Sequence, residues 1–118
     1  MPDVRLPPHA ELRALSDNAL LDRLRPLSRG STEREAIGEI LLSRHAGLVR
    51  SCVWQYRRSP EPAEDLLQVG YLGLLKAING FDPACGDSLD TYAAPCISGR
   101  SKGYVRLSAE GRTHGTSR

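Results

Sequence analysis

The sequence predicts an all-α fold, a compact bundle of about four helices, from three observations. Apolar residues recur at helical spacing, proline and capping residues mark the helix ends, and no stretch shows the alternation typical of a β-strand. With 118 residues, 40% of them hydrophobic, the chain fits one domain with one modest core. We expect a flexible arm over residues 1–15, a helical domain over 16–106 and a disordered basic tail over 107–118.

The first predicted helix is short. Ser16 or Asp17 can cap it, its apolar positions reach Leu24, and Pro26 ends it because proline cannot continue a helix. Three prolines in the first eight positions favour an arm ahead of it.

A long second helix is predicted after a break at residues 28–30. Thr32 and Glu35 have the spacing of a capping box, in which each side chain bonds the backbone N–H of the other residue. Apolar residues then recur at helical spacing as far as Arg58, so we expect one helix of about seven turns.

The third predicted helix begins at Pro62, a residue suited to a first helical turn, and closes at Gly80. It has two chemically different faces. Its apolar residues fall at i, i+7, i+8 and i+11, one stripe that we assign to the core: Leu67, Leu74, Leu75 and Ile78. A polar stripe assigned to a partner steps by three residues: Asp65, Gln68 and Tyr71.

Turn residues predict a loop at 81–87, after which Ser88 or Asp90 can cap a last helix. Pro95 lacks a backbone N–H, so we expect it to kink this helix or to begin a new segment.

Charge is unevenly distributed along the chain. Residues 61–90 carry six acidic side chains and one lysine, whereas residues 98–118 carry five basic side chains and one glutamate. The acidic part suits a basic protein surface, and the basic part would gain from neutralising a nucleic-acid backbone.

Several functional classes are not indicated. The three cysteines, Cys52, Cys85 and Cys96, show no Cys-x-x-Cys spacing, which argues against a disulfide framework or a zinc site. The histidines are far apart and are interpreted as structural or solvated: His9, His45 and His114. No nucleophile lies beside a histidine and no phosphate loop is present, so we expect no enzyme activity, cofactor or metal. No apolar run approaches a membrane span or a signal segment, which predicts a cytoplasmic location.

An ordered series of short motifs adds a family resemblance. The series reads His-Ala-Gly-Leu-Val at 45–49, Glu-Pro at 61–62, Glu-Asp-Leu at 64–66, Gln-Val-Gly at 68–70, Gly-Leu-Leu-Lys-Ala at 73–77, Phe-Asp-Pro at 81–83, Thr-Tyr-Ala at 91–93, then Pro95, Ile97 and Gly99. In these residues the chain resembles conserved region 2 of the bacterial sigma-70 family, closest to the stress and sporulation type of Gram-positive bacteria, including actinobacteria. The resemblance covers about two thirds of the chain, from Ser31 to Arg106.

The resemblance implies two binding surfaces for transcription initiation. The helix of residues 64–81 would dock on a coiled coil of the β′ subunit of core RNA polymerase, through Asp65, Leu66, Gln68, Val69, Tyr71 and Leu72. The last helix would hold the non-template strand of the −10 promoter element as single-stranded DNA, through Thr91, Tyr92, Gly99, Arg100, Lys102, Tyr104 and Arg106. Tyr92 matches the family aromatic beside the flipped adenine, and the spacing of Lys102, Tyr104 and Arg106 places them on one side of a helix.

Departures from the family pattern keep a second interpretation open. Leu89 and Asp90 replace a usual Phe-Ser pair, which removes an aromatic ring and places a negative charge where phosphate is expected. Ser101 replaces an apolar residue, and Gly103 weakens a helix interior. The alternative is a truncated sigma-like decoy that binds polymerase or an anti-sigma factor without recognising a promoter. A helix-turn-helix over residues 63–78 is less favoured because few polar side chains there could read a groove.

Overall fold

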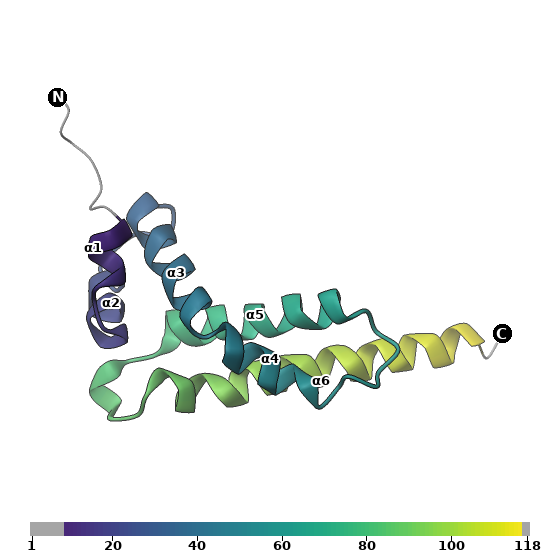
Figure 1. Cartoon of the computed structure of the whole chain (residues 1–118). Helices are drawn as coiled ribbons and strands as arrows, with labels where there is room; N and C mark the ends of the chain where they lie inside the picture. The colour runs from purple at the N-terminus through teal and green to yellow at the C-terminus, as the bar shows by residue number, and fades with distance from the viewer. Residues whose placement is uncertain (1–8, 117–118) are drawn as a thin grey trace.

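The computed structural model describes residues 9–116, and this part of the chain is all-helical, without a strand. The elements, labelled in Figure 1, are α1 (His9–Arg13), α2 (Asp17–Leu24), α3 (Thr32–Arg44), α4 (Ala46–Trp54), α5 (Ala63–Gly80), the short 3-10 helix η1 (Pro83–Cys85) and α6 (Leu89–Thr116). The predicted all-α class is confirmed. None of the helices in the described range is both long and apolar enough to cross a lipid bilayer.

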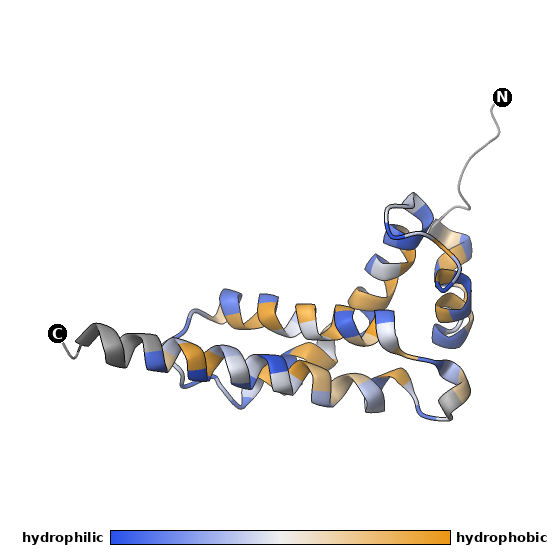
Figure 2. Cartoon of the chain, turned by 180° about the vertical axis from the view of Figure 1, so that it is seen from behind, coloured by the Kyte–Doolittle hydropathy of each residue, from blue (hydrophilic) through white to orange (hydrophobic). Residues whose placement is uncertain are grey.

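The helices form two groups (Figure 1). The long helices α5 and α6 lie side by side and antiparallel, joined by the loop that contains η1, and α4 packs against both. Helices α1, α2 and α3 gather at the end of this pair where α5 finishes and α6 begins, as the view from behind also shows (Figure 2). The far end of α6 continues past the beginning of α5.

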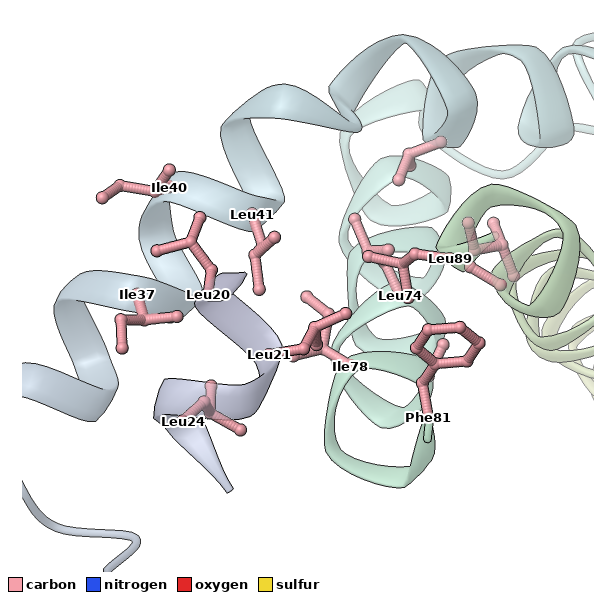
Figure 3. Packing of buried hydrophobic residues seen from close by; sticks show 14 of the residues in the cluster. Leu20, Leu21, Leu24, Ile37, Ile40, Leu41, Leu74, Ile78, Phe81 and Leu89 are labelled. Atoms are coloured by element: carbon pink, nitrogen blue, oxygen red, sulfur yellow. The ribbon is translucent and has the colours of Figure 1, made fainter. Parts of the chain in front are cut away.

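One hydrophobic core joins the two groups. Figure 3 shows side chains of α2 and α3 meeting those of α5 and the start of α6: Leu20, Leu21, Leu24, Ile37, Ile40, Leu41, Leu74, Ile78, Phe81 and Leu89. The same core continues between α4, α5 and α6 through Val49, Val53, Ala93 and Ile97. Burial of this apolar surface, at about 25 cal/mol per Å², holds the two groups together.

Two glycines allow α5 to approach its neighbours closely. A Cβ atom built on Gly73 would lie 2.8 Å from the carbonyl oxygen of Cys96 and 2.8 Å from Cα of Ile97, both on α6. A Cβ atom on Gly70 would lie 2.8 Å from Cγ1 of Val49 on α4. All three distances are too short for a real Cβ contact, so α5 can pack this closely only because Gly70 and Gly73 have no side chain.

Most of the predicted helix ends are confirmed. Ser16 caps α2 by accepting a hydrogen bond from the backbone N–H of Ala19 at 3.2 Å. Pro62 immediately precedes α5, which ends at Gly80. Of the two proposed caps for α6, Ser88 acts as the cap, since its Oγ accepts from the N–H of Thr91 at 3.1 Å.

The prediction of a single helix over residues 32–58 is wrong. The structure has two helices, α3 and α4, which meet at His45, where φ is −107° and ψ is 18°. The cap of α3 is Ser31 rather than Thr32, because the Oγ of Ser31 accepts from the N–H of Arg34 at 3.0 Å. No proline or glycine marks the break at His45, and its ring instead contacts residues of two remote helices.

Both ends of the chain differ from the expected domain boundaries. Helix α1 lies inside the expected arm and buries Leu12, while residues 1–8 lie outside the described range. Helix α6 is assigned without interruption through Pro95 and continues to Thr116, beyond the expected limit at Arg106. Pro95 therefore does not begin a new segment.

Candidate functional site

The outer face of α5 is a line of exposed side chains directed away from the core. Its members are Asp65, Gln68, Leu72, Leu75, Lys76 and Asn79. Leu72 is 51% exposed and Leu75 is 38% exposed, so the line has an apolar centre with polar side chains at both ends. We call these six residues the α5 outer face. An apolar centre with a polar surround is the usual composition of a protein-binding surface.

The predicted register of α5 needs correction at two positions. Leu75, assigned to the core, is exposed, whereas Leu66, assigned to the partner, is only 4% exposed and packs inside the protein. The buried face of α5 is formed by Leu66, Gly70, Gly73, Leu74, Ala77 and Ile78. The cause is geometric: α4 and α6 pack close to the two glycines, and this places Leu66 inward and Leu75 outward.

Three further α5 residues, one predicted for the core and two for the polymerase contact, are only partly exposed. Tyr71 and Leu67 are half-buried and pack against the edge of the core, and Val69 is also half-buried. Tyr71 is therefore partly a core residue and not a free contact side chain. The spacing alone did not show this, because Tyr71 shares the three-residue step of Asp65 and Gln68.

A second line of exposed residues runs along α6. Thr91, Tyr92, Gly99, Lys102 and Arg106 are all exposed, and the 3.6-residue period places them on one side of the helix. Tyr92 is 38% exposed, and its ring lies against that of Phe81, with the centroids 5.3 Å apart. We call these five residues the α6 basic face. It combines a supported aromatic ring with two cations two to four helical turns further along.

Tyr104 and Arg100 do not belong to that face. By the same helical period they lie on other sides of α6, which corrects the expectation that Tyr104 accompanies Lys102 and Arg106. The Tyr104 hydroxyl instead donates toward the start of α5, with its oxygen 3.4 Å from Oδ2 of Asp65 and 3.5 Å from Oε1 of Glu61.

The surroundings of Tyr104 also affect its ionisation. Partial desolvation, and then the negative charges of Asp65 and Glu61, raise the pKa of the Tyr104 hydroxyl above its ordinary value. Each of these effects disfavours the phenolate anion. At neutral pH the hydroxyl therefore keeps its proton and can donate to the carboxylates.

Asp90 is directed away from the α6 basic face. Its Oδ1 lies 2.5 Å from Nδ1 of His45, and Nε2 of the same ring lies 2.8 Å from Oδ2 of Asp17. Arg44 completes the cluster with a bond of 2.9 Å from Nη1 to Oδ1 of Asp17. The expectation that Asp90 opposes phosphate on the strand path loses its geometric basis, because this carboxylate faces the junction of α3 and α4.

Two further residues that depart from the family pattern, Leu89 and Ser101, pack inside the protein. Leu89 is buried in the core. Ser101 is fully buried, and its hydroxyl donates to the carbonyl oxygen of Ile97 at 2.9 Å, so this polar side chain is satisfied inside the protein.

The described residues contain no candidate metal site. No group of three or more histidine, cysteine, aspartate or glutamate side chains there is placed to hold a metal ion. Cys52 and Cys96 are free, partly buried thiols.

Comparison with known proteins points to one family. The family described as Sigma-70 region 2 matches residues 41–109, which is more than half of the chain. Similar proteins include the RNA polymerase sigma-F factor of Kitasatospora aureofaciens, 38% identical over 97 residues that cover 82% of this chain and 32% of the relative. The RNA polymerase sigma-B factor of Bacillus subtilis is 38% identical over 72 residues, covering 61% of this chain and 28% of the relative. The RNA polymerase sigma-G factor of Clostridium acetobutylicum is 31% identical over 97 residues, which cover 82% of this chain and 37% of the relative.

The chain thus spans about a third of the length of such relatives. No solved structure gives a significant match.

Proposed function

Because the chain belongs to the sigma-70 family, we propose that it acts as a region 2 module of a sigma factor in transcription initiation. The module would bind core RNA polymerase through the α5 outer face and the single-stranded −10 element through the α6 basic face. The observation that carries this proposal is that two neighbouring antiparallel helices present separate exposed lines of different chemistry. The α5 line has an apolar centre between polar side chains, and the α6 line combines an aromatic ring with cations.

The chemistry of the α5 outer face supports a protein partner. Leu72 and Leu75 provide apolar area that a partner can cover, and Gln68 can both donate and accept hydrogen bonds. Asp65 adds a negative charge for a basic partner such as the β′ coiled coil. Of the six residues predicted for this contact, Leu66 is withdrawn because it is buried, and Val69 and Tyr71 because they are half-buried. Leu75 is added because it is exposed.

The chemistry of the α6 basic face supports a single strand. A base can stack on the exposed part of Tyr92, whose ring orientation is fixed by Phe81. Lys102 and Arg106 then lie along the helix, where they can neutralise successive phosphates. Thr91 and Gly99 lie on the same side, and the small size of glycine allows a backbone to approach closely.

The decoy, which would bind polymerase or an anti-sigma factor only, is the second candidate. One observation favours it: Tyr92 is the one aromatic side chain among the five residues of the α6 basic face. With a single stacking platform, the gain in free energy is about 1–3 kcal/mol for one base.

The test is binding of a −10-like non-template strand by the chain joined to core polymerase, followed by fluorescence anisotropy. We expect tighter binding of this strand than of a scrambled one, and a loss of about 1–3 kcal/mol with Tyr92→Ala. Gln68→Ala should weaken binding to polymerase itself by at least about 1 kcal/mol. Gln55→Ala is the matched control, since Gln55 is an exposed glutamine that directly follows α4 and is not part of the α5 outer face.

The outcomes separate the two candidates. Polymerase binding that depends on Gln68, combined with no sequence preference and no effect of Tyr92→Ala, would support the decoy. Polymerase binding that is equal for Gln68→Ala and Gln55→Ala would contradict the α5 part of the proposal.

A further inference from the structure

A hollow of about 290 Å³ lies between α4 and the start of α5, and the proposed function does not use it. Four residues make up the apolar part of its lining, which we call its apolar floor: Val53, Ala63, Leu66 and Leu67. Trp54, at the end of α4, forms part of its wall. The α5 residues that line it lie on the side of the helix that faces α4, away from Gln68 and Leu72.

Trp54 is exposed without an evident structural reason. It is the only tryptophan of the chain and is 63% exposed, next to the apolar floor of the hollow. Burial of a tryptophan side chain is strongly favourable, so an exposed one beside an apolar hollow is typical of a binding surface. Tryptophan and arginine are also the residue types most enriched among binding hot spots.

Arg57 holds the tryptophan ring in a defined arrangement. Its guanidinium carbon lies 4.5 Å from the centre of the Trp54 ring, a cation–π contact. Its Nη1 also donates to the carbonyl oxygen of Trp54 at 3.1 Å. These contacts order both side chains before a partner arrives, which lowers the entropic cost of binding.

The charge around the hollow is predominantly positive. Arg50 and Arg57 line it, and Arg58 follows in the chain as an exposed residue. Among the described residues, these three guanidinium groups form no ion pair, unlike Arg23, Arg25 and Arg44. The one acid of the lining, Glu61, interacts with the Tyr104 hydroxyl. The guanidinium groups therefore attract a partner that carries carboxylates.

We propose that this hollow is the docking site for a segment of another protein, an amphipathic stretch with an apolar anchor flanked by aspartate or glutamate. The anchor would fill the apolar floor beside Trp54, and its flanking carboxylates would pair with Arg50 and Arg57. A protein segment fits better than a single-stranded nucleic acid for two reasons. Arg57 already covers one face of the Trp54 ring, which reduces its use for base stacking, and the lining contains no second aromatic ring on which a neighbouring base could stack.

The proposal is tested with a displayed library of random peptides of about 15 residues, a length that covers a helix-in-groove contact. Peptides are selected on the full chain and counter-selected on Trp54→Ala. We expect the enriched sequences to share an apolar anchor with neighbouring Asp or Glu. A labelled consensus peptide should bind about tenfold or more weakly to Trp54→Ala and to Arg50→Gln/Arg57→Gln. Its binding should also shift the emission of Trp54, the single tryptophan fluorophore.

Leu107→Ala is the matched control, because Leu107 is 67% exposed and lies on α6, outside the lining of the hollow. This variant should bind the peptide like the parent chain. Circular dichroism checks that each variant is folded. Enriched peptides that are basic, that bind Trp54→Ala equally well, or that lose affinity with Leu107→Ala would overturn the proposal. Binding of a dT oligonucleotide that depends on Trp54 and displaces the peptide would assign the hollow to nucleic acid instead.

Discussion

Asp90 and His45 form a contact that joins the first turn of α6 to the junction of α3 and α4, with Oδ1 of Asp90 2.5 Å from Nδ1 of the imidazole. The other ring nitrogen of His45 faces Asp17 on α2, so a single side chain connects three parts of the fold. The imidazole ring thus lies between two carboxylates, one on α2 and one on α6. The bend between α3 and α4 therefore depends on residues that are remote in the sequence.

The first prediction follows from this contact and concerns Asp90→Ser. Removing the carboxylate should lower the free energy of unfolding by about 0.5–1 kcal/mol, because the partner ring is largely buried while Asp90 itself is exposed. It should leave binding of single-stranded DNA unchanged, since the carboxylate is directed away from the α6 basic face. Urea denaturation and anisotropy measure the two quantities. Asp87→Ser, which removes an exposed acid of the preceding loop, is the control, and a gain in DNA affinity specific to Asp90→Ser would contradict the assignment.

A second prediction compares two glycine substitutions. Gly73→Ala should destabilise the fold by about 1–3 kcal/mol, because its Cβ would lie 2.8 Å from backbone atoms of α6, which cannot move aside as a side chain can. Gly103→Ala should stabilise the fold by about 0.4–1 kcal/mol, since no atom lies within 4 Å of its Cβ and alanine favours a helix. Thermal melts of both variants decide the matter. Equal effects would mean that α5 and α6 are not packed backbone to backbone.

The register of α5 gives a third prediction. Ile78→Ala should cost about 2–5 kcal/mol of stability, because Ile78 is fully buried. Leu75→Ala should lower the free energy of unfolding much less than Ile78→Ala does. It should nevertheless weaken polymerase binding, because Leu75 belongs to the α5 outer face. Denaturation curves and a titration with core polymerase test both parts. If Leu75→Ala proves the more destabilising of the two, the helix is rotated relative to this description.

Local signals in the sequence predicted three of the helix starts. Ser16, Pro62 and Ser88 act within one turn of their own position, through a cap or a fixed φ, so no knowledge of the rest of the fold was needed. The all-α class follows from the same periodicity.

Contacts between remote segments explain what the sequence did not predict. The break at His45 depends on Asp17 and Asp90, which lie on other helices. The exchange of Leu66 and Leu75 depends on where α4 and α6 pack, because a four-residue apolar stripe is compatible with more than one rotation of a helix. A usable signal was present in Gly70 and Gly73, since glycines inside a helix often mark a close approach to another segment.

A fourth prediction uses the raised pKa of Tyr104. A group whose pKa is higher in the folded state than in the unfolded state stabilises the fold at low pH and loses this contribution as pH rises through the folded pKa. Stability should therefore fall as pH rises beyond the ordinary tyrosine value of 10.0, and Tyr104→Phe should reduce this fall. Asp65→Asn should shift the ionisation of Tyr104 toward lower pH, because it removes one of the negative charges that oppose the phenolate. Absorbance titrations of the parent chain, Asp65→Asn and Tyr104→Phe isolate this tyrosine from the other three.

The last prediction separates two arginines of α6 that the sequence alone had grouped together. Arg106 lies on the same side of the helix as Lys102 and Tyr92, whereas Arg100 lies on another side, although both are exposed. If a single strand follows the α6 basic face, Arg106→Ala removes one phosphate contact, and the slope of log affinity against log salt should fall in magnitude by about 0.7. Arg100→Ala removes the same charge from the protein but should leave this slope nearly unchanged. Anisotropy at several salt concentrations measures both slopes with the chain bound to core polymerase. Equal changes for the two variants would show that net charge, and not the geometry of this face, determines binding.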